Sequence, residues 1–183
     1  MALDNNATLV IGAGNYFTTP YVELSPEALP SDLSAVGAPW EAIGHTSLEE
    51  IFNISSEGGD PTTLGTLQNR ALRTRYSDRI ETISFTLQQF DEAGLKLYFG
   101  SNATIGADGE VQVPQSPEPT VVSFLAVFVD GSNYFAIYAP KAEIFRGDDL
   151  SAGDTESLAG LPLTVKPLVH GSNTWAYAVT PLA

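Results

Sequence analysis

A ten-residue run of alternating side chains, residues 79–88, constrains the fold of this chain more than any other feature. Successive side chains of a β-strand point to opposite faces, so the run has one apolar face, made by Ile83, Phe85 and Leu87. The other face is rich in small hydroxyl side chains, those of Thr82, Ser84 and Thr86. This pattern is typical of an antiparallel strand that covers a core on one side only.

The neighbouring residues predict what this strand leads from and to. We expect it to pair with residues 66–76 through a tight reversal at Ser77 and Asp78. The ten residues 91–100 predict a short helix, because two acids open the segment, where the helix dipole favours negative charge. Gly100 stands where a glycine commonly ends a helix.

A second strong signal lies in residues 120–129, which are apolar at both alternating sets of positions and therefore predict a strand buried on both faces. The turn-forming residues 130–133 lead into residues 134–139, so the two segments form a predicted hairpin. Residues 142–145 continue the second strand past Pro140. The remaining predicted strands or extended segments are residues 7–12, a strand containing Tyr16 and Phe17, and residues 48–54, 161–169 and 174–180.

These elements predict a mainly β protein, an antiparallel β-sandwich or small barrel with one flanking α-helix. We expect one domain over residues 1–183, since the chain is long enough for one sound core. The domain is predicted to begin with an N-terminal arm of about residues 1–15. Proline, glycine and polar residues predict loop-rich segments at residues 23–39, 55–65, 101–119 and 147–160.

Composition excludes several classes of protein. Hydrophobic residues make up 43% of the chain, as expected of a folded protein. No apolar run is long enough to cross a membrane, so we expect no membrane association. The first six residues lack the basic patch and apolar stretch of a signal peptide, and we expect none there. The absence of cysteine rules out disulfides and thiolate metal sites.

Charge is distributed unevenly along the chain. The formal net charge of −14 disfavours adhesion to nucleic acid or to an anionic membrane. Four of the eight basic residues nevertheless fall within ten positions, at Arg70, Arg73, Arg75 and Arg79. Residues 41–60, in contrast, contain five acids and no base, among them Glu49, Glu50, Glu57 and Asp60.

The two charged segments have more than one interpretation. We interpret them as a candidate contact between subunits, because arginine forms bidentate pairs with carboxylates. The alternative is a solvated strand edge whose charge prevents aggregation. Nucleic-acid binding by the arginines fits poorly with so acidic a chain.

No pattern of residues predicts catalysis. The two histidines, His45 and His170, stand beside turn-like sequence, and no nucleophile elbow or zinc-binding pair accompanies them. The turns at Asp108 and Asp130 have too few oxygen ligands for a calcium loop. The sequence does not decide whether a divalent ion binds elsewhere. We expect neither a cofactor nor a catalytic residue.

One stretch resembles a known family. Residues 40–47, Trp-Glu-Ala-Ile-Gly-His-Thr-Ser, precede an acidic segment, a basic segment and the alternating strand, and residues 91–100 follow. This order resembles the major tail tube proteins of long-tailed, siphovirus-type bacteriophages. The resemblance covers roughly residues 8–180 and is strongest at 40–100 and 140–170.

The resemblance implies a structural protein of the virion tail, which is assembled in the host cytoplasm. Its subunits would form stacked rings, six per ring, around a channel through which genome DNA passes without tight binding. Other expected partners are the tape-measure protein and further tail proteins. In this interpretation the hydroxyl side chains of Thr82, Ser84 and Thr86 line the channel or a seam between subunits.

Two functions of other classes remain open from the sequence. A β-sandwich module for carbohydrate binding or adhesion would present exposed aromatic side chains, for which Trp40, Tyr76 and Trp175 are the candidates. A small hydrolase would use acidic residues instead. Adjacent acids such as Asp148 and Asp149 point to opposite faces of a strand and favour solvated charge over a catalytic pair.

Overall fold

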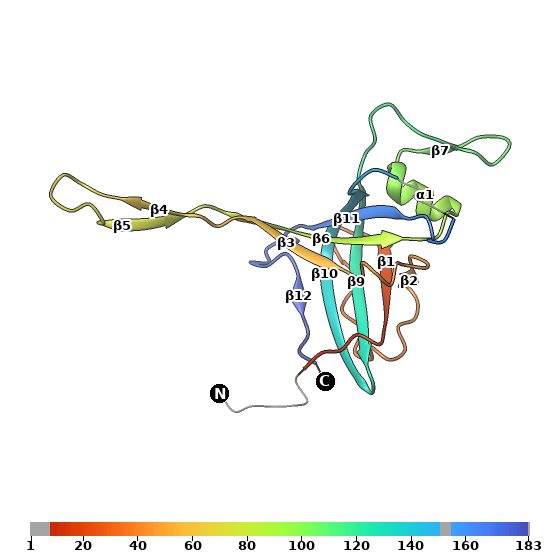
Figure 1. Ribbon diagram of the computed structural model, residues 1–183, viewed down its shortest axis with the longest axis horizontal. Helices are drawn as coiled ribbons and strands as arrows, with labels where there is room; N and C mark the ends of the chain where they lie inside the picture. Colours follow the sequence, from red (N-terminus) through yellow and green to blue (C-terminus); the bar gives the residue numbers. More distant parts are fainter. Residues whose placement is uncertain (1–7, 151–154, 183) are drawn as a thin grey trace.

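The structure, a computed structural model, describes residues 8–150 and 155–182. It is an antiparallel β protein with one helix in this part of the chain (Figure 1). The first strands are β1 (Ala13–Pro20), β2 (Glu41–Ala42), β3 (Asn53–Gly58), β4 (Pro61–Leu64), β5 (Arg73–Tyr76) and β6 (Arg79–Leu87). They are followed by α1 (Glu92–Phe99), β7 (Thr104–Ile105), β8 (Val111–Gln112), β9 (Thr120–Asp130), β10 (Asn133–Arg146), β11 (Leu161–Pro167) and β12 (Ala178–Val179).

The main sheet has the strand order β2-β1-β9-β10-β11-β6-β3, and β12 pairs with β10 beside this path. Its centre is the β9–β10 hairpin, whose valine and phenylalanine side chains favour strands. Residues 142–145 extend β10 past Pro140 as predicted, after a register shift between Ala139 and Ala142. The first half of β10 contacts β12 and its second half contacts β11.

The main core lies between the two halves of this sheet, which curls so that β1 faces β6. Ile83, Phe85 and Leu87 are buried in it, as the alternation predicts. Residues 43–47 bridge the open side, since Ile43 N–H donates to the Tyr16 carbonyl and Ser47 N–H to that of Thr86, both at 2.9 Å. The sheet curls without closing, and the predicted mainly β fold with one helix is confirmed.

A second core covers the outer face of the β9–β10 hairpin. Trp40 and Tyr138 pack edge to face there, with ring centroids 6.3 Å apart. Leu29, Leu33 and Val36, from the segment before β2, cover them. Strand β9 is therefore buried on both faces, which confirms the prediction for residues 120–129.

Helix α1 begins and ends where the sequence predicts. The Asp91 carboxylate accepts a hydrogen bond from Gly94 N–H at 2.8 Å, and Gly100 N–H donates to the Lys96 carbonyl at 2.9 Å. The helix packs on β10 and β11 with Tyr98 buried. No helix within residues 8–150 or 155–182 is long and apolar enough to cross a membrane.

The pairing predicted for residues 66–76 is wrong. Strand β6 pairs with β3, with Ile54 opposite Ile83, and β5 pairs with β4. Ser77 and Asp78 therefore join β5 to β6 along the same arm, and the chain reverses within residues 65–72. The physical reason is that β3 brings Ile54 to the edge of the core, whereas every residue of β5 is exposed.

Other segments also differ from their predicted character. Residues 55–58 and 61–64, predicted as loop, belong to β3 and β4, and residues 13–15 of the predicted arm belong to β1. A small β7–β8 hairpin interrupts residues 101–119, and only residues 178–179 of the last predicted strand pair. Residues 1–7 of the arm and 151–154 of the acidic loop lie outside the described residues.

Candidate functional site

A long hairpin extends from the body of the protein (Figure 1). Its inner part is the outer half of the β3–β6 ladder, and its outer part is the β4–β5 ladder. We call residues 61–76 the hairpin tip. A two-stranded hairpin without a sheet or helix beside it has little stability of its own. A projection of this kind therefore gains most when it packs against another surface.

The two ladders meet at a break in the hairpin. Gly58 and Gly59 both have positive φ, at 81° and 75°, which glycine adopts without steric cost. Gly59 N–H donates to the Asp78 carbonyl and Ser77 N–H to the Asp60 carbonyl, both at 3.2 Å. The break is thus narrow, and the arms stay hydrogen-bonded across it.

The hairpin tip is basic and partly apolar at its surface. It contains Arg70, Arg73 and Arg75 and no acidic residue. Arg73 and Arg75 are two positions apart on β5 and share a face, with Leu64 directly opposite Arg73. Nearby Leu67 is 93% exposed and Tyr76 is 67% exposed. Exposed arginine, leucine and tyrosine side chains together are typical of a surface that binds another protein.

None of these three arginines forms an ion pair within the described residues. Arg79, at the start of β6, is different: it lies 3.6 Å from Glu81 on its own strand. Among the described residues, the structure therefore separates the predicted cluster into three arginines of the tip without an ion pair and one paired arginine beside the break, opposite Gly58.

The predicted acidic partners are also divided between two places. Glu57 lies at the end of β3 and Asp60 in the break, so both belong to the hairpin itself. Glu49 and Glu50 lie on the body, immediately before β3. The structure thus does not bring the arginines of the tip against any of these four carboxylates in one subunit.

Glu49 and Glu50 line an open hollow of about 560 Å³ between the segment before β3 and the strands β6 and β11. Thr82, Ser84 and Thr86 line it together with them, so this predicted face and two of the predicted acids share one site. Thr86 Oγ1 donates to Glu50 Oε2 at 3.1 Å, and the hydroxyls of Thr82 and Ser55 lie 2.7 Å apart. Asp148 adds a third carboxylate, and no described lysine or arginine lines the hollow.

The base of the hairpin is held by a side chain that the sequence did not indicate. Tyr177, from the segment before β12, donates its hydroxyl to Glu81 Oε2 at 2.5 Å. This hydrogen bond, together with burial, raises the pKa of Tyr177 to about 12. Since 96 positions separate the two residues, no local pattern in the sequence points to the contact.

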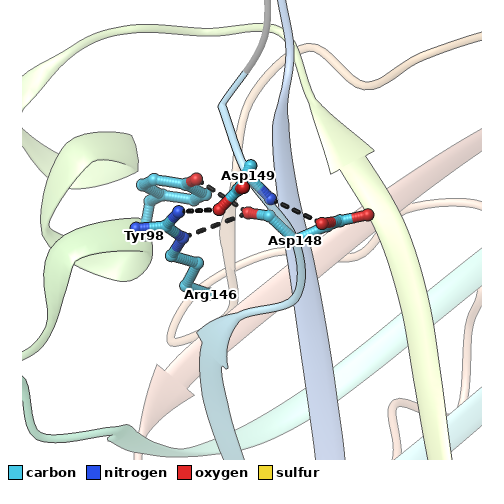
Figure 2. Close-up of polar contacts among 4 residues, drawn as sticks. All are labelled: Tyr98, Arg146, Asp148 and Asp149. Atoms are coloured by element: carbon cyan, nitrogen blue, oxygen red, sulfur yellow. Dashed lines mark hydrogen bonds and ion pairs between the residues drawn. The ribbon is translucent and has the colours of Figure 1, made fainter.

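A second polar cluster holds the end of β10 against α1 (Figure 2). Arg146 pairs with the Asp149 carboxylate and lies over the Tyr98 ring, 5.3 Å from its centroid. Tyr98 donates its hydroxyl to the Asp148 carbonyl at 2.8 Å. These contacts position Asp148 at the edge of the hollow, which we call the acidic hollow because Glu49, Glu50 and Asp148 line it. Asp149 serves as the ion-pair partner of Arg146.

The residues considered for carbohydrate binding, catalysis or metal binding do not lie together in one site. Trp40, considered as an exposed platform for a sugar, is buried, whereas Tyr76 lies on the hairpin and Trp175 beside Tyr138. The His170 ring is hydrogen-bonded to the Tyr21 hydroxyl at 2.8 Å. In the part of the chain that the structure describes, no three acidic or histidine side chains are grouped to hold a metal ion.

Comparison with known proteins identifies similar chains. The family model described as phage tail tube protein matches residues 1–180. The major tail protein Gp23 of Mycobacterium phage D29 is 36% identical over 165 residues, which cover 88% of this chain and 80% of that protein. The major tail protein Gp23 of Mycobacterium phage L5 is 36% identical over 134 residues, or 72% of this chain and 65% of that protein.

Proposed function

Because the chain belongs to the phage tail tube protein family and is a structural component of the virion tail, not an enzyme, we propose that it polymerises into stacked rings of six subunits. The rings enclose a channel that delivers genome DNA. Assembly takes place in the host cytoplasm. The tape-measure protein and other tail proteins are its further partners.

The observation that carries this proposal is the projecting hairpin. Its tip exposes leucine, tyrosine and arginine side chains. In Figure 1 the tip projects away from the body, and no other labelled strand or helix lies beside it. Burial of such side chains against a neighbour removes apolar area from water and supplies carboxylates to the arginines. A monomer gains nothing comparable from this hairpin.

Charge supports a channel that does not hold DNA. A ring of six subunits carries a formal charge of about −84, from −14 per chain, and such a ring repels a polyanion. The uncharged hydroxyl face of Thr82, Ser84 and Thr86 is our candidate for the channel wall or for a seam between subunits. Arg70, Arg73, Arg75 and Arg79 and the acids Glu49, Glu50, Glu57 and Asp60 are our candidates for contacts between subunits.

Self-association of the purified protein tests the proposal. Multi-angle light scattering over a concentration series is expected to show species larger than the monomer, and negative-stain microscopy is expected to show rings or tubes. A monomer at every concentration, with neither rings nor tubes on the grid, contradicts the proposal. A glycan-array signal from such a monomer instead supports the carbohydrate-binding alternative.

A further inference from the structure

The hairpin tip and the acidic hollow have complementary chemistry. The tip presents three arginines without an acid, and Arg73 and Arg75 project from one face of β5. The hollow presents Glu49, Glu50 and Asp148 without a described base. The tip carries only positive side-chain charge and the hollow only negative side-chain charge. Contact between the two surfaces pairs the arginines with the carboxylates.

The residues that line the hollow are also suited to binding a hairpin. The hydroxyls of Thr82, Ser84, Thr86 and Thr164 border it beside the carboxylates. Hydroxyl groups both donate and accept hydrogen bonds, so they satisfy guanidinium and backbone groups of an entering strand. The partly buried apolar side chains of Ile51 and Phe52 at the same site match the exposed leucines of the tip.

The tip of a subunit is too far from its own hollow to fill it. Ser55 lines the hollow, and Leu64, opposite Arg73, lies nine residues further along the extended arm, or about 30 Å. Figure 1 shows that the arm continues outward from the body over this stretch. The occupant must therefore be another molecule.

From this complementarity, and resting on the proposed self-assembly, we propose that the hairpin tip of one copy docks into the acidic hollow of a second copy. Arg73 and Arg75 pair with Glu49 and Glu50 of that copy. The two surfaces are different, so the contact is head-to-tail, and each subunit offers one tip and receives another. Repetition of such a contact closes a ring or continues a helical tube, in contrast to a two-fold dimer, which stops at two copies.

Cross-linking tests the contact on folded protein, because the natural chain has no cysteine. Thr62→Cys places a thiol opposite Arg75, on the face of the hairpin tip that carries the two arginines of β5, and Asn53→Cys places one on the exposed edge of the hollow. Equal amounts of the two variants are assembled, treated with a short bismaleimide, and digested for mass spectrometry. We expect a cross-linked peptide that joins position 62 to position 53.

Ser132→Cys provides the matched control, since Ser132 is exposed in the turn between β9 and β10. We expect the 62–53 product to exceed the 62–132 product by roughly tenfold or more, since position 53 lies at the docked site and position 132 does not. Equal yields, while the wild-type protein forms rings or tubes, overturn the docking and leave the assembly standing. A monomeric wild type overturns the assembly and the docking with it.

Charge reversal provides an independent test. Arg73→Glu with Arg75→Glu in one variant, and Glu49→Arg with Glu50→Arg in another, are each expected to raise the concentration required for assembly by roughly tenfold or more. An equimolar mixture is expected to recover assembly, because every tip then meets a hollow of opposite charge. The control Glu41→Arg with Asp108→Arg raises the net charge by the same amount as Glu49→Arg with Glu50→Arg, at exposed positions outside the hollow.

Three results decide this second test. Recovery in the mixture, with circular dichroism unchanged for each variant, supports the docking. Assembly of both variants at the wild-type concentration overturns it. Loss of assembly in the control to the same extent also overturns it, because bulk charge then accounts for the effect.

Discussion

The aromatic rings of Tyr16 and Phe85 stack with their centroids 4.2 Å apart and their planes inclined by 12°. Their strands, β1 and β6, are separated by β9, β10 and β11 in the order of the sheet. The stacking therefore shows that the sheet curls far enough around its core to bring β1 and β6 face to face. Tyr16 also donates its hydroxyl to the Ile51 carbonyl, which ties the same ring to the segment that leads into the hairpin.

The first prediction concerns this stack. Phe85→Ala is expected to lower the free energy of unfolding by about 3–5 kcal/mol, because it leaves a cavity at a side chain that is 3% exposed. Urea denaturation followed by circular dichroism measures the change. Leu67→Ala, in the exposed hairpin tip, is the control and is expected to change monomer stability by less than about 0.5 kcal/mol. Similar losses in the two variants contradict this account of the core.

The second prediction concerns the cap of α1. Asp91→Ala is expected to cost about 1 kcal/mol, because Gly94 N–H loses its acceptor. Hydrogen bonds from Gly94 and Gln89 hold the pKa of Asp91 below its ordinary value. The stabilisation is therefore complete above the unfolded pKa of about 4 and is lost as pH falls through the lower folded pKa.

Denaturation at a series of pH values separates this cap from a general effect of acid. The difference in free energy of unfolding between wild type and Asp91→Ala is expected to be constant near neutral pH. It is expected to shrink at pH values below about 4. Asp91→Asn, which keeps an acceptor oxygen without the charge, is expected to retain most of the stability. A difference that is independent of pH down to strong acid contradicts the role of the carboxylate.

The third prediction concerns the break in the hairpin. A Cβ at Gly58 would lie 2.2 Å from the Asp78 carbonyl oxygen, whereas one at Gly109 would meet no atom within 4 Å. Both residues have similar positive φ, 81° and 84°, so Gly109→Ala is a matched control for backbone strain alone. Gly58→Ala is expected to speed amide hydrogen exchange in β3 and the start of β6 at least about tenfold. Unchanged exchange in these strands shows that the hairpin tolerates displacement at the break.

The fourth prediction concerns the base of the hairpin. Tyr177→Phe is expected to cost about 1 kcal/mol, since Glu81 loses a hydrogen bond in a partly exposed setting. Because the pKa of Tyr177 is raised to about 12, its contribution is complete below the unfolded value of about 10 and is lost between about 10 and 12 as pH rises. Ultraviolet titration of wild type against Tyr177→Phe measures this ionisation directly. A difference spectrum that titrates near 10 contradicts the hydrogen bond.

The last prediction concerns DNA. Assembled protein is expected to show no measurable affinity for duplex DNA at physiological salt, because the chain is strongly acidic and each phosphate contact would slow passage through a channel. Fluorescence anisotropy with labelled duplex at two salt concentrations measures this. Tight, salt-sensitive binding that disappears in Arg73→Glu with Arg75→Glu means that the arginines face DNA. The proposed channel without adhesion is then abandoned.

The sequence by itself determined the features that depend on local periodicity. The alternation in residues 79–88 identified the buried trio of Ile83, Phe85 and Leu87, and the doubly apolar run identified β9 as buried on both faces. Asp91 and Gly100 marked the ends of the helix. Each of these follows from side-chain geometry over a few neighbouring residues, which is the same in any tertiary setting.

Only the tertiary structure decided which segments pair and meet. The pattern of residues 79–88 is equally satisfied by either neighbouring strand, and the partner is β3 because Ile54 reaches the core while β5 has no buried face. The arginine cluster was visible in the sequence, yet the sequence did not show that Arg79 pairs with Glu81 while the other three form no ion pair with the described residues. The acidic hollow and the Tyr177–Glu81 contact join residues far apart in the chain. Such contacts depend on strand register and on how far the sheet curls, and local periodicity carries no information about either.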